Sequence, residues 1–220
     1  MRRISVIGAS VVLAVLIVLV IPQLVLPGIA AQRLRDRLAR SGTVLDVEVD
    51  AFPAIELLWH HADRVVVRMA SYRSSAAELS RTLSQVGDAG TLDASANRLI
   101  AGLLTLHDAR LQKRGNQLTG TATVTESDLR ASFPLLDGVA PVASSGGQVT
   151  LRGTATVLGL TATVDATVRP AAGALVVSPD LPLGGLATIT LFSNPAIAVE
   201  GIAAASSAGG FSLKANGRLR

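Results

Sequence analysis

The chain has no cysteine, which excludes disulfide bonds, thiolate metal sites and cysteine nucleophiles. Aromatic residues are scarce as well, because the 220 residues include only four Phe, one Trp and one Tyr. The 20 cations exceed the 16 carboxylates, but outside the N-terminal region they are scattered along the chain. A nucleic-acid interface requires a basic patch and usually aromatic platforms for stacking, so we expect no nucleic-acid partner.

Recognisable catalytic motifs are also missing. The sequence contains no Gly-x-Ser-x-Gly elbow, no phosphate-binding glycine loop and no dinucleotide fingerprint. The histidines are His60, His61 and His107, and the adjacent pair lacks the i, i+4 spacing of a helical zinc site. The sequence therefore predicts no catalytic residues, no metal site and no cofactor, and we expect the protein not to be an enzyme.

The N-terminal segment has the character of a membrane span. Residues 4–21 carry no charge and are mainly Val, Ile, Leu and Ala. Eighteen helical residues extend about 27 Å, close to the roughly 30 Å of hydrocarbon in a bilayer. Signal-peptide cleavage after Ala31 would place Ile29 at position −3, where small residues are preferred. We therefore predict that residues 1–28 are a membrane anchor or uncleaved signal segment, and that residues 29–220 form one domain.

The charges around this segment give no clear orientation. Two arginines precede it and four follow it, so the positive-inside count alone would place the body in the cytoplasm. Long domains, however, cross the membrane largely regardless of charge, and the Thr/Ser-rich body suits an exported protein. We expect a single-pass protein of the cell membrane, with a cytoplasmic N-terminus and an extracytoplasmic, periplasmic body.

Residues 29–40 are predicted to form an amphipathic helix just after the span. Ala31, Leu34 and Leu38 share one face at helical spacing. The opposite face carries the cations Arg33, Arg37 and Arg40. These arginines suit contact with anionic headgroups at the membrane surface. The alternative is a solvated face on an ordinary first helix of the domain, and the two interpretations are compatible.

Much of the remaining chain alternates between apolar and polar residues, which is the period of a half-buried strand. Residues 45–51 and 63–70 are predicted strands of this kind, and a closing pair is predicted over 197–205 and 211–219. The inward face of the last strand consists of Phe211, Leu213, Ala215, Gly217 and Leu219.

Two further hairpins are predicted from their turns. Alternating runs flank Leu158-Gly159 within residues 148–169, and similar runs flank Arg114-Gly115. The expected pairs are Val157 with Leu160, Ala155 with Ala162 and Arg152 with Asp165 in the first, and Leu111 with Leu118, Ala109 with Gly120 and Asp108 with Thr121 in the second. Helices are expected over residues 74–86 and 126–133, the second capped by Thr125 or Ser127, and residues 138–147 read as a loop.

The inward positions of the central strands are unusually small. Protein interiors are close-packed, so short side chains must meet something bulky. Either a helix lies close to the sheet, or the sheet encloses an apolar channel that acyl chains fill, gaining roughly 0.8 kcal/mol per buried CH₂. We predict that two chains of a phospholipid or similar lipid bind there, and the predicted lining residues are Ala122, Val124, Leu151, Ala155, Val157, Leu160, Ala162, Val164, Ala166 and Val168.

Several segments follow one another in an order typical of a known family. After the membrane segment come a helix with Leu34 and Leu38, the segments VDAFP at 49–53, RVVVRM at 64–69 and TESDL at 125–129, and a closing strand over 210–219. This order resembles the actinobacterial LmeA-like family of exported phospholipid-binding proteins, over most of residues 29–220. Residues 75–104 depart from the family's pattern, because their apolar spacing is more helical than expected.

The resemblance implies a TULIP-like, tubular lipid-binding fold of the α+β class. In that fold a strongly curved, mainly antiparallel β-sheet wraps around one or two helices, here after an N-terminal transmembrane helix. The implied function is phospholipid binding, for lipid transfer or maintenance of the cell envelope. The alternative is a non-enzymatic envelope scaffold or partner-binding module with a solid core, which would expose an apolar patch instead.

Overall fold

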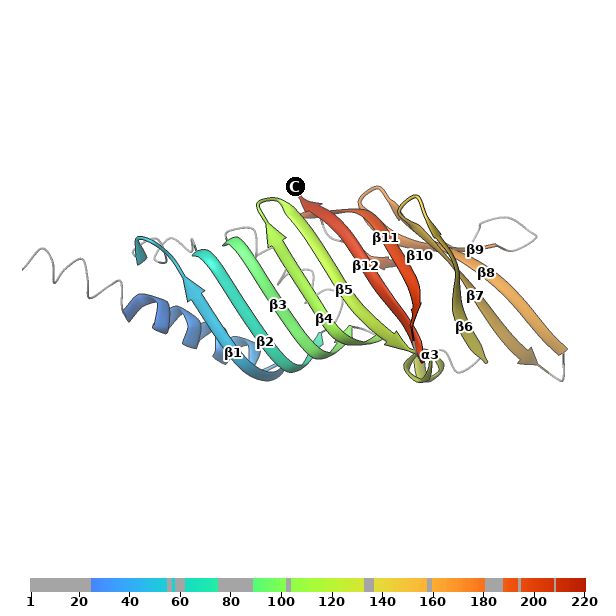
Figure 1. Cartoon of the computed structure of the whole chain (residues 1–220), viewed down its shortest axis with the longest axis horizontal. Coiled ribbons are helices and arrows are strands. Elements are labelled where there is room, and N and C mark those ends of the chain that lie inside the picture. Colours follow the sequence, from blue (N-terminus) through green and yellow to red (C-terminus); the bar gives the residue numbers. More distant parts are fainter. Residues whose placement is uncertain are drawn as a thin grey trace, which may run out of the picture.

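The computed structural model describes residues 25–54, 57, 62–74, 89–101, 104–132, 137–157, 160–180, 188–193, 195–207 and 209–220. The strands in this part of the chain form two sheets (Figure 1). In spatial order, the seven-stranded sheet contains β1 (Gly42–Asp50), β2 (Ala62–Ser74), β3 (Ala89–Ala101), β4 (Leu104–Arg114), β5 (Gln117–Thr125), β12 (Gly210–Leu219) and β11 (Ile197–Ser207). The five-stranded sheet contains β10 (Ile189–Phe192), β9 (Ala174–Pro179), β8 (Leu160–Ala171), β7 (Gln148–Val157) and β6 (Gly138–Ser145).

The expected α+β class with mainly antiparallel strands is confirmed. Among the paired strands described, β2 and β3 are parallel and all other pairs are antiparallel. Parallel neighbours require a crossover connection, and this one falls in residues 75–88, outside the described part, as does most of the helix expected over 74–86. The strands divide between two sheets, which differs from the single sheet that we expected.

In the sequence, the strands of the five-stranded sheet lie between β5 and β11 of the other sheet. The chain leaves β5 through the short helix α3 (Glu126–Ser132), forms β6 to β10, and returns as β11 and β12, where β12 pairs with β5. The sheets pack together along β11. Three clusters of side chains join them: Val149, Val168 and Ile202; Leu118, Ile197 and Leu219 with Phe192; and Val124, Leu129 and Phe211 with Val139.

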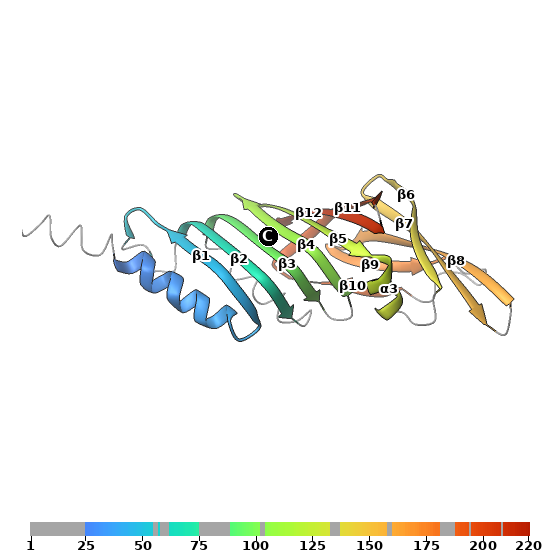
Figure 2. The same ribbon diagram turned by 60° about the horizontal axis from the view of Figure 1, so that its bottom comes forward.

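A helix over residues 25–38 lies beside β1 (Figures 1 and 2). The guanidinium of Arg35 fixes it there by donating from Nη2 to the backbone oxygen of Leu45 at 3.0 Å. None of the helices described is long and apolar enough to cross a membrane. The predicted span over residues 4–21 lies outside the described residues, so the anchor stays a prediction.

The predicted register of the β7–β8 hairpin is confirmed over its whole length. Ala155 pairs with Ala162, Val157 pairs with Leu160, and the turn itself lies outside the described residues. Arg152 lies opposite Asp165, with Nε 2.7 Å from Oδ1 and Nη2 2.8 Å from Oδ2. This bidentate pair and the matched alternation of the two strands explain why the sequence specifies one register.

The predicted register of the β4–β5 hairpin is wrong by two residues. Leu111 pairs with Gly120 instead of Leu118, because the turn is formed by Gly115 and Asn116. Gly115 has φ +56°, which favours glycine at the first central position of a two-residue turn. Over residues 110–121 a shift of two residues leaves every side chain on its predicted face, so alternation alone does not distinguish the two registers.

Two segments form strands where the sequence pattern indicated otherwise. Residues 138–147 were expected as a loop, but β6 occupies Gly138–Ser145. β6 is an edge strand, where Pro141 and its missing N–H are tolerated. β3 lies within the stretch 75–104, whose apolar spacing is more helical than expected, and pairing with both β2 and β4 overrides that local preference.

Candidate functional site

The seven-stranded sheet has one apolar face, which we call the inner face. In β12 the predicted inward residues alternate with Ser212, Lys214, Asn216 and Arg218, all of which are exposed, so the predicted facing is confirmed. Paired residues share a face, so the register carries this face across the sheet. One row runs through all seven strands, from β1 to β11: Val47, Val67, Ala94, Leu111, Gly120, Ala215 and Ile202.

The middle of the inner face carries very short side chains. We call Ala94 and Ala96 of β3, Gly120 and Ala122 of β5, and Ala215 of β12 the small-residue strip; all five are half-buried. Among the described residues, a Cβ added to Gly120 would approach only the backbone oxygen of Arg110, at 3.9 Å. The described chain therefore leaves space above Gly120, whereas interior positions normally meet packed atoms.

The predicted lipid-lining residues divide between the two sheets. Ala122 and Val124 lie on β5, and the other eight lie on the paired faces of β7 and β8. Ala162 and Val164 are exposed, and Leu151 and Ala166 are half-buried. For Ala155, Val157 and Leu160 only the backbone positions are described. The structure thus brings one of the ten, Ala122, onto the small-residue strip.

Two of the predicted lining residues pack against the protein itself. Val124 is 2% exposed and contacts Leu129 and Phe211, while Val168 is 4% exposed and contacts Val149. These side chains belong to the clusters that join the two sheets. Contact of any of the ten residues with lipid stays a prediction.

The sequence-based list missed four members of the strip. Gly120 and Ala215 were recognised as inward-facing but not as lining, and Ala94 and Ala96 were missed because their segment reads as helical. Leu92, Leu99 and Ile100 provide that helical spacing. The signal that finds the alanines is the cross-strand row itself, which requires the pairing of β3 with β4.

A lysine lies on the apolar side of the same sheet. Lys113 pairs with Leu92 and Leu118, both of which are buried on the inner face, and Lys113 itself is buried. Its Nζ donates to the backbone oxygen of Ala89 at the start of β3. A buried ammonium needs such an acceptor, because an uncompensated charge would be costly there. Lys113 therefore fixes the beginning of β3 against β4.

The five-stranded sheet has a polar depression on its other face. It is shallow and open, has a volume of about 510 Å³, and is lined by Arg152, Thr163, Asp165 and Asp180. The ion pair between Arg152 and Asp165 lies in its floor; each partner stabilises the other's charge by hydrogen bonding, which raises the pKa of Arg152 and lowers that of Asp165. Charged walls do not suit acyl chains, so this depression is separate from the small-residue strip.

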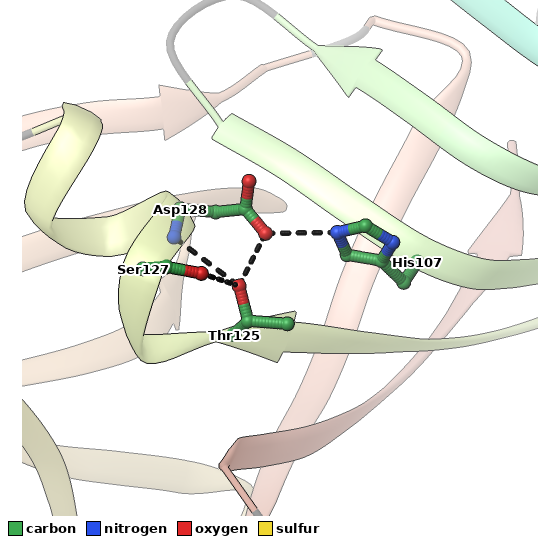
Figure 3. Close-up of polar contacts among 4 residues, drawn as sticks. All are labelled: His107, Thr125, Ser127 and Asp128. Carbon is green, nitrogen blue, oxygen red and sulfur yellow. Dashed lines mark hydrogen bonds and ion pairs between the residues drawn. The ribbon is translucent and has the colours of Figure 1, made fainter.

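A cluster of polar side chains holds α3 against β4 (Figure 3). The Thr125 hydroxyl accepts the Asp128 backbone N–H at 3.2 Å, which confirms Thr125 as the cap of the predicted helix. The same hydroxyl donates to the Asp128 carboxylate, and His107 Nε2 lies 2.8 Å from Asp128 Oδ2. The Thr125 hydrogen bond, followed by His107 and Arg98, lowers the pKa of Asp128 against the opposing effect of burial.

This cluster does not have the arrangement of a catalytic triad. Thr125 bonds to the carboxylate of Asp128 and not to His107, so no described hydroxyl is placed for activation by the imidazole. Among the described residues no three His, Asp or Glu side chains are grouped to hold a metal, and His60 and His61 lie outside that part. The cluster instead positions Leu129, which is buried between Val124 and Phe211 at the junction of the sheets.

We expect Asp128→Asn to destabilise the protein by about 1–2 kcal/mol at neutral pH, because the charge-assisted bonds are lost. The folded pKa of Asp128 lies below its ordinary value of 3.8, so its contribution is complete above that pH. It is lost as the pH falls through the folded pKa. Denaturant unfolding at several pH values should therefore show the wild-type advantage shrinking in acid. Asp108→Asn, at an exposed position, is the control and should change stability little. An equal loss of stability in the two variants would contradict the stabilising role assigned to Asp128.

The predicted membrane-surface arginines lie on the helix beside β1 and at its end. Arg33, Arg37 and Arg40 are exposed, and Ala31, Leu34 and Leu38 on the other face are half-buried. The amphipathic helix itself is therefore confirmed, although it extends over residues 25–38. Contact of its arginines with a membrane stays a prediction.

Comparison with known protein families gave a match over most of these elements. A family model described as LmeA-like phospholipid-binding matches residues 23–194, well over half of the chain. Comparison with curated proteins and with solved structures gave no match. The matched range includes the helix over 25–38, β1 to β10 and four of the five strip residues, and it ends before β11 and β12.

Proposed function

The chain belongs to the LmeA-like phospholipid-binding family, and from this premise we propose that it holds phospholipid acyl chains along the small-residue strip. The observation that carries the proposal is the small-residue strip of short, half-buried residues on an apolar face, above which the described part of the chain leaves space at Gly120. An acyl chain fits such a lining, because it requires no hydrogen bond and each methylene that it buries makes binding more favourable.

The strip is also placed well for a chain-like ligand. Its members lie on β3, β5 and β12, so a ligand along the strip would run across the strands. Leu111 and Ala109 of β4 lie between them and continue the apolar surface. A curved, tubular arrangement around this face is the TULIP-like form that we propose.

We propose further that the protein acts at a membrane of the cell envelope. Support comes from the uncharged sequence over residues 4–21 and from the exposed arginines just after it. In this proposal residues 1–28 anchor the chain, the N-terminus is cytoplasmic, and the body lies in the extracytoplasmic space. A protein so placed would exchange phospholipid with the adjacent bilayer, for transfer or for maintenance of the envelope.

The direct test is to identify what co-purifies with the full chain. The protein would be purified in mild detergent, extracted with organic solvent and analysed by mass spectrometry, and we expect phospholipid in the extract. Added phospholipid should also raise the unfolding temperature, since a ligand at 100 times its Kd stabilises by about 2.7 kcal/mol. Absence of bound lipid together with absence of protection would favour the scaffold with a solid core.

A further inference from the structure

Apolar side chains are exposed at the end of the molecule where the described chain begins. The helix over 25–38 begins at this end and β1 finishes there, and both views place the two segments together (Figures 1 and 2). Val25 and Ile29 are exposed on the helix. Phe52, which follows β1, is 79% exposed and is the most exposed of the large apolar residues described. Such a grouping on a folded protein usually marks an interaction surface.

The hydrogen bond between Arg35 and Leu45 shows how far the helix over 25–38 and β1 are shifted along each other. The helix and β1 run in opposite directions, because only the turn at residues 39–41 separates them. Ten helical residues from Arg35 back to Val25 extend about 15 Å. Five strand residues forward from Leu45 extend about 16 Å, to Asp50. Val25 and the segment carrying Phe52 therefore lie at about the same level along this end.

The exposed helix surface changes character along its length. Val25, Ile29, Arg33 and Arg37 follow one another at intervals of four, so they lie along one ridge, and all four are exposed. The ridge is apolar at its beginning and cationic towards its end. This order matches the layers of a bilayer. The apolar beginning of the ridge would reach the hydrocarbon, and the arginines would lie at the anionic headgroups.

We propose that this end of the molecule docks on an anionic bilayer, with Phe52 inserted among the lipids and Arg33 and Arg37 at the headgroups. The proposal deepens the proposed function, on which it rests, by naming the face through which lipid would be exchanged. The occupant is a bilayer because the chain immediately before Val25 includes the uncharged residues 4–21, which bring a membrane to this end.

The absence of cysteine allows a direct test in the full chain. Phe52→Cys would be labelled with an environment-sensitive fluorophore and reconstituted into vesicles of phosphatidylcholine and phosphatidylglycerol. Asp63 accepts the backbone N–H of Phe52 at 2.6 Å, and the substitution leaves this hydrogen bond in place. The matched control is Ala203→Cys, which is exposed on β11 at the opposite edge of the same sheet.

We expect lipids carrying a quencher near the headgroup to quench the label at position 52 several-fold more than the label at 203. Replacing phosphatidylglycerol by phosphatidylcholine should reduce the difference. Equal quenching at both positions would overturn the proposal, and so would a blue shift at 52 that depends on protein concentration without vesicles, which would indicate a second copy. Lipid binding is tested separately, by mass spectrometry of the co-purifying phospholipid. Equal quenching at the two positions would therefore overturn the docking face and leave the proposed lipid binding untouched.

Discussion

Ala122→Trp is expected to lower the amount of co-purifying phospholipid by at least about tenfold while the protein remains folded. The indole would occupy the space beside Gly120, where the described chain is open. Displacing only two methylenes of an acyl chain costs about 1.6 kcal/mol, which is somewhat more than tenfold in occupancy. The measurement is quantitative mass spectrometry of solvent extracts from equal amounts of wild type and variant.

The neighbouring residue provides the control for this substitution. Thr121 is exposed on the opposite face of β5, between Arg110 and Lys214, so Thr121→Trp adds the same side chain outside the strip. It should retain wild-type lipid content. Equal lipid in Ala122→Trp and wild type would contradict the placement of the ligand. Ala162→Trp tests the five-stranded sheet separately, because it should lose lipid only if the acyl chains extend along β8.

Phe211→Ala should reduce the free energy of unfolding by about 3–5 kcal/mol, because truncating a buried aromatic leaves a cavity. Phe211 is buried and packs with Val124 and Leu129, and Val139 of the other sheet contacts the same cluster. The loss therefore weakens the junction between the sheets as well as β12 itself. Equilibrium unfolding in urea, followed by circular dichroism, measures the effect.

The exposed phenylalanine at the other end of the molecule serves as the matched control. Phe52→Ala removes the same atoms from an exposed position, and its effect on unfolding should stay within about 0.5 kcal/mol. A loss below about 1 kcal/mol in Phe211→Ala would show that the cluster relaxes around the vacancy or that the sheets are held elsewhere. Reduced lipid content in Phe211→Ala would further indicate that the junction supports the strip.

Local pairing was the part of the fold most accessible from the sequence. The β7–β8 register follows from matched alternation and from the Arg152–Asp165 pair, both of which are visible in the residue order. The closing pair of strands and the cap at Thr125 were accessible for the same reason, because each depends on neighbouring residues. The β4–β5 register was not, since a shift of two residues preserves the alternation.

The division into two sheets and most of the strip depend on contacts between distant segments. A hairpin such as β7–β8 reads identically whether it joins the first sheet or forms a second one. Ala94 and Ala96 join the strip only because β3 is held between β2 and β4, against the helical spacing of its own apolar residues. Ala122 was identified correctly as inward-facing, because its facing follows from the alternation of β5 alone.

The insertion of the five-stranded sheet has a consequence for how the protein is made. Thr125 ends β5 and pairs with Gly210, so the partner of β5 is synthesised only after the five-stranded sheet and β11. Until β12 is synthesised, the backbone amides at the edge of β5 lack their strand partner and can pair with a strand of another nascent chain. A truncation that removes β12 should consequently do more than shorten the sheet. The truncated protein should aggregate and depend on chaperones, because pairing between strands far apart in the sequence forms slowly and its intermediates are prone to aggregation.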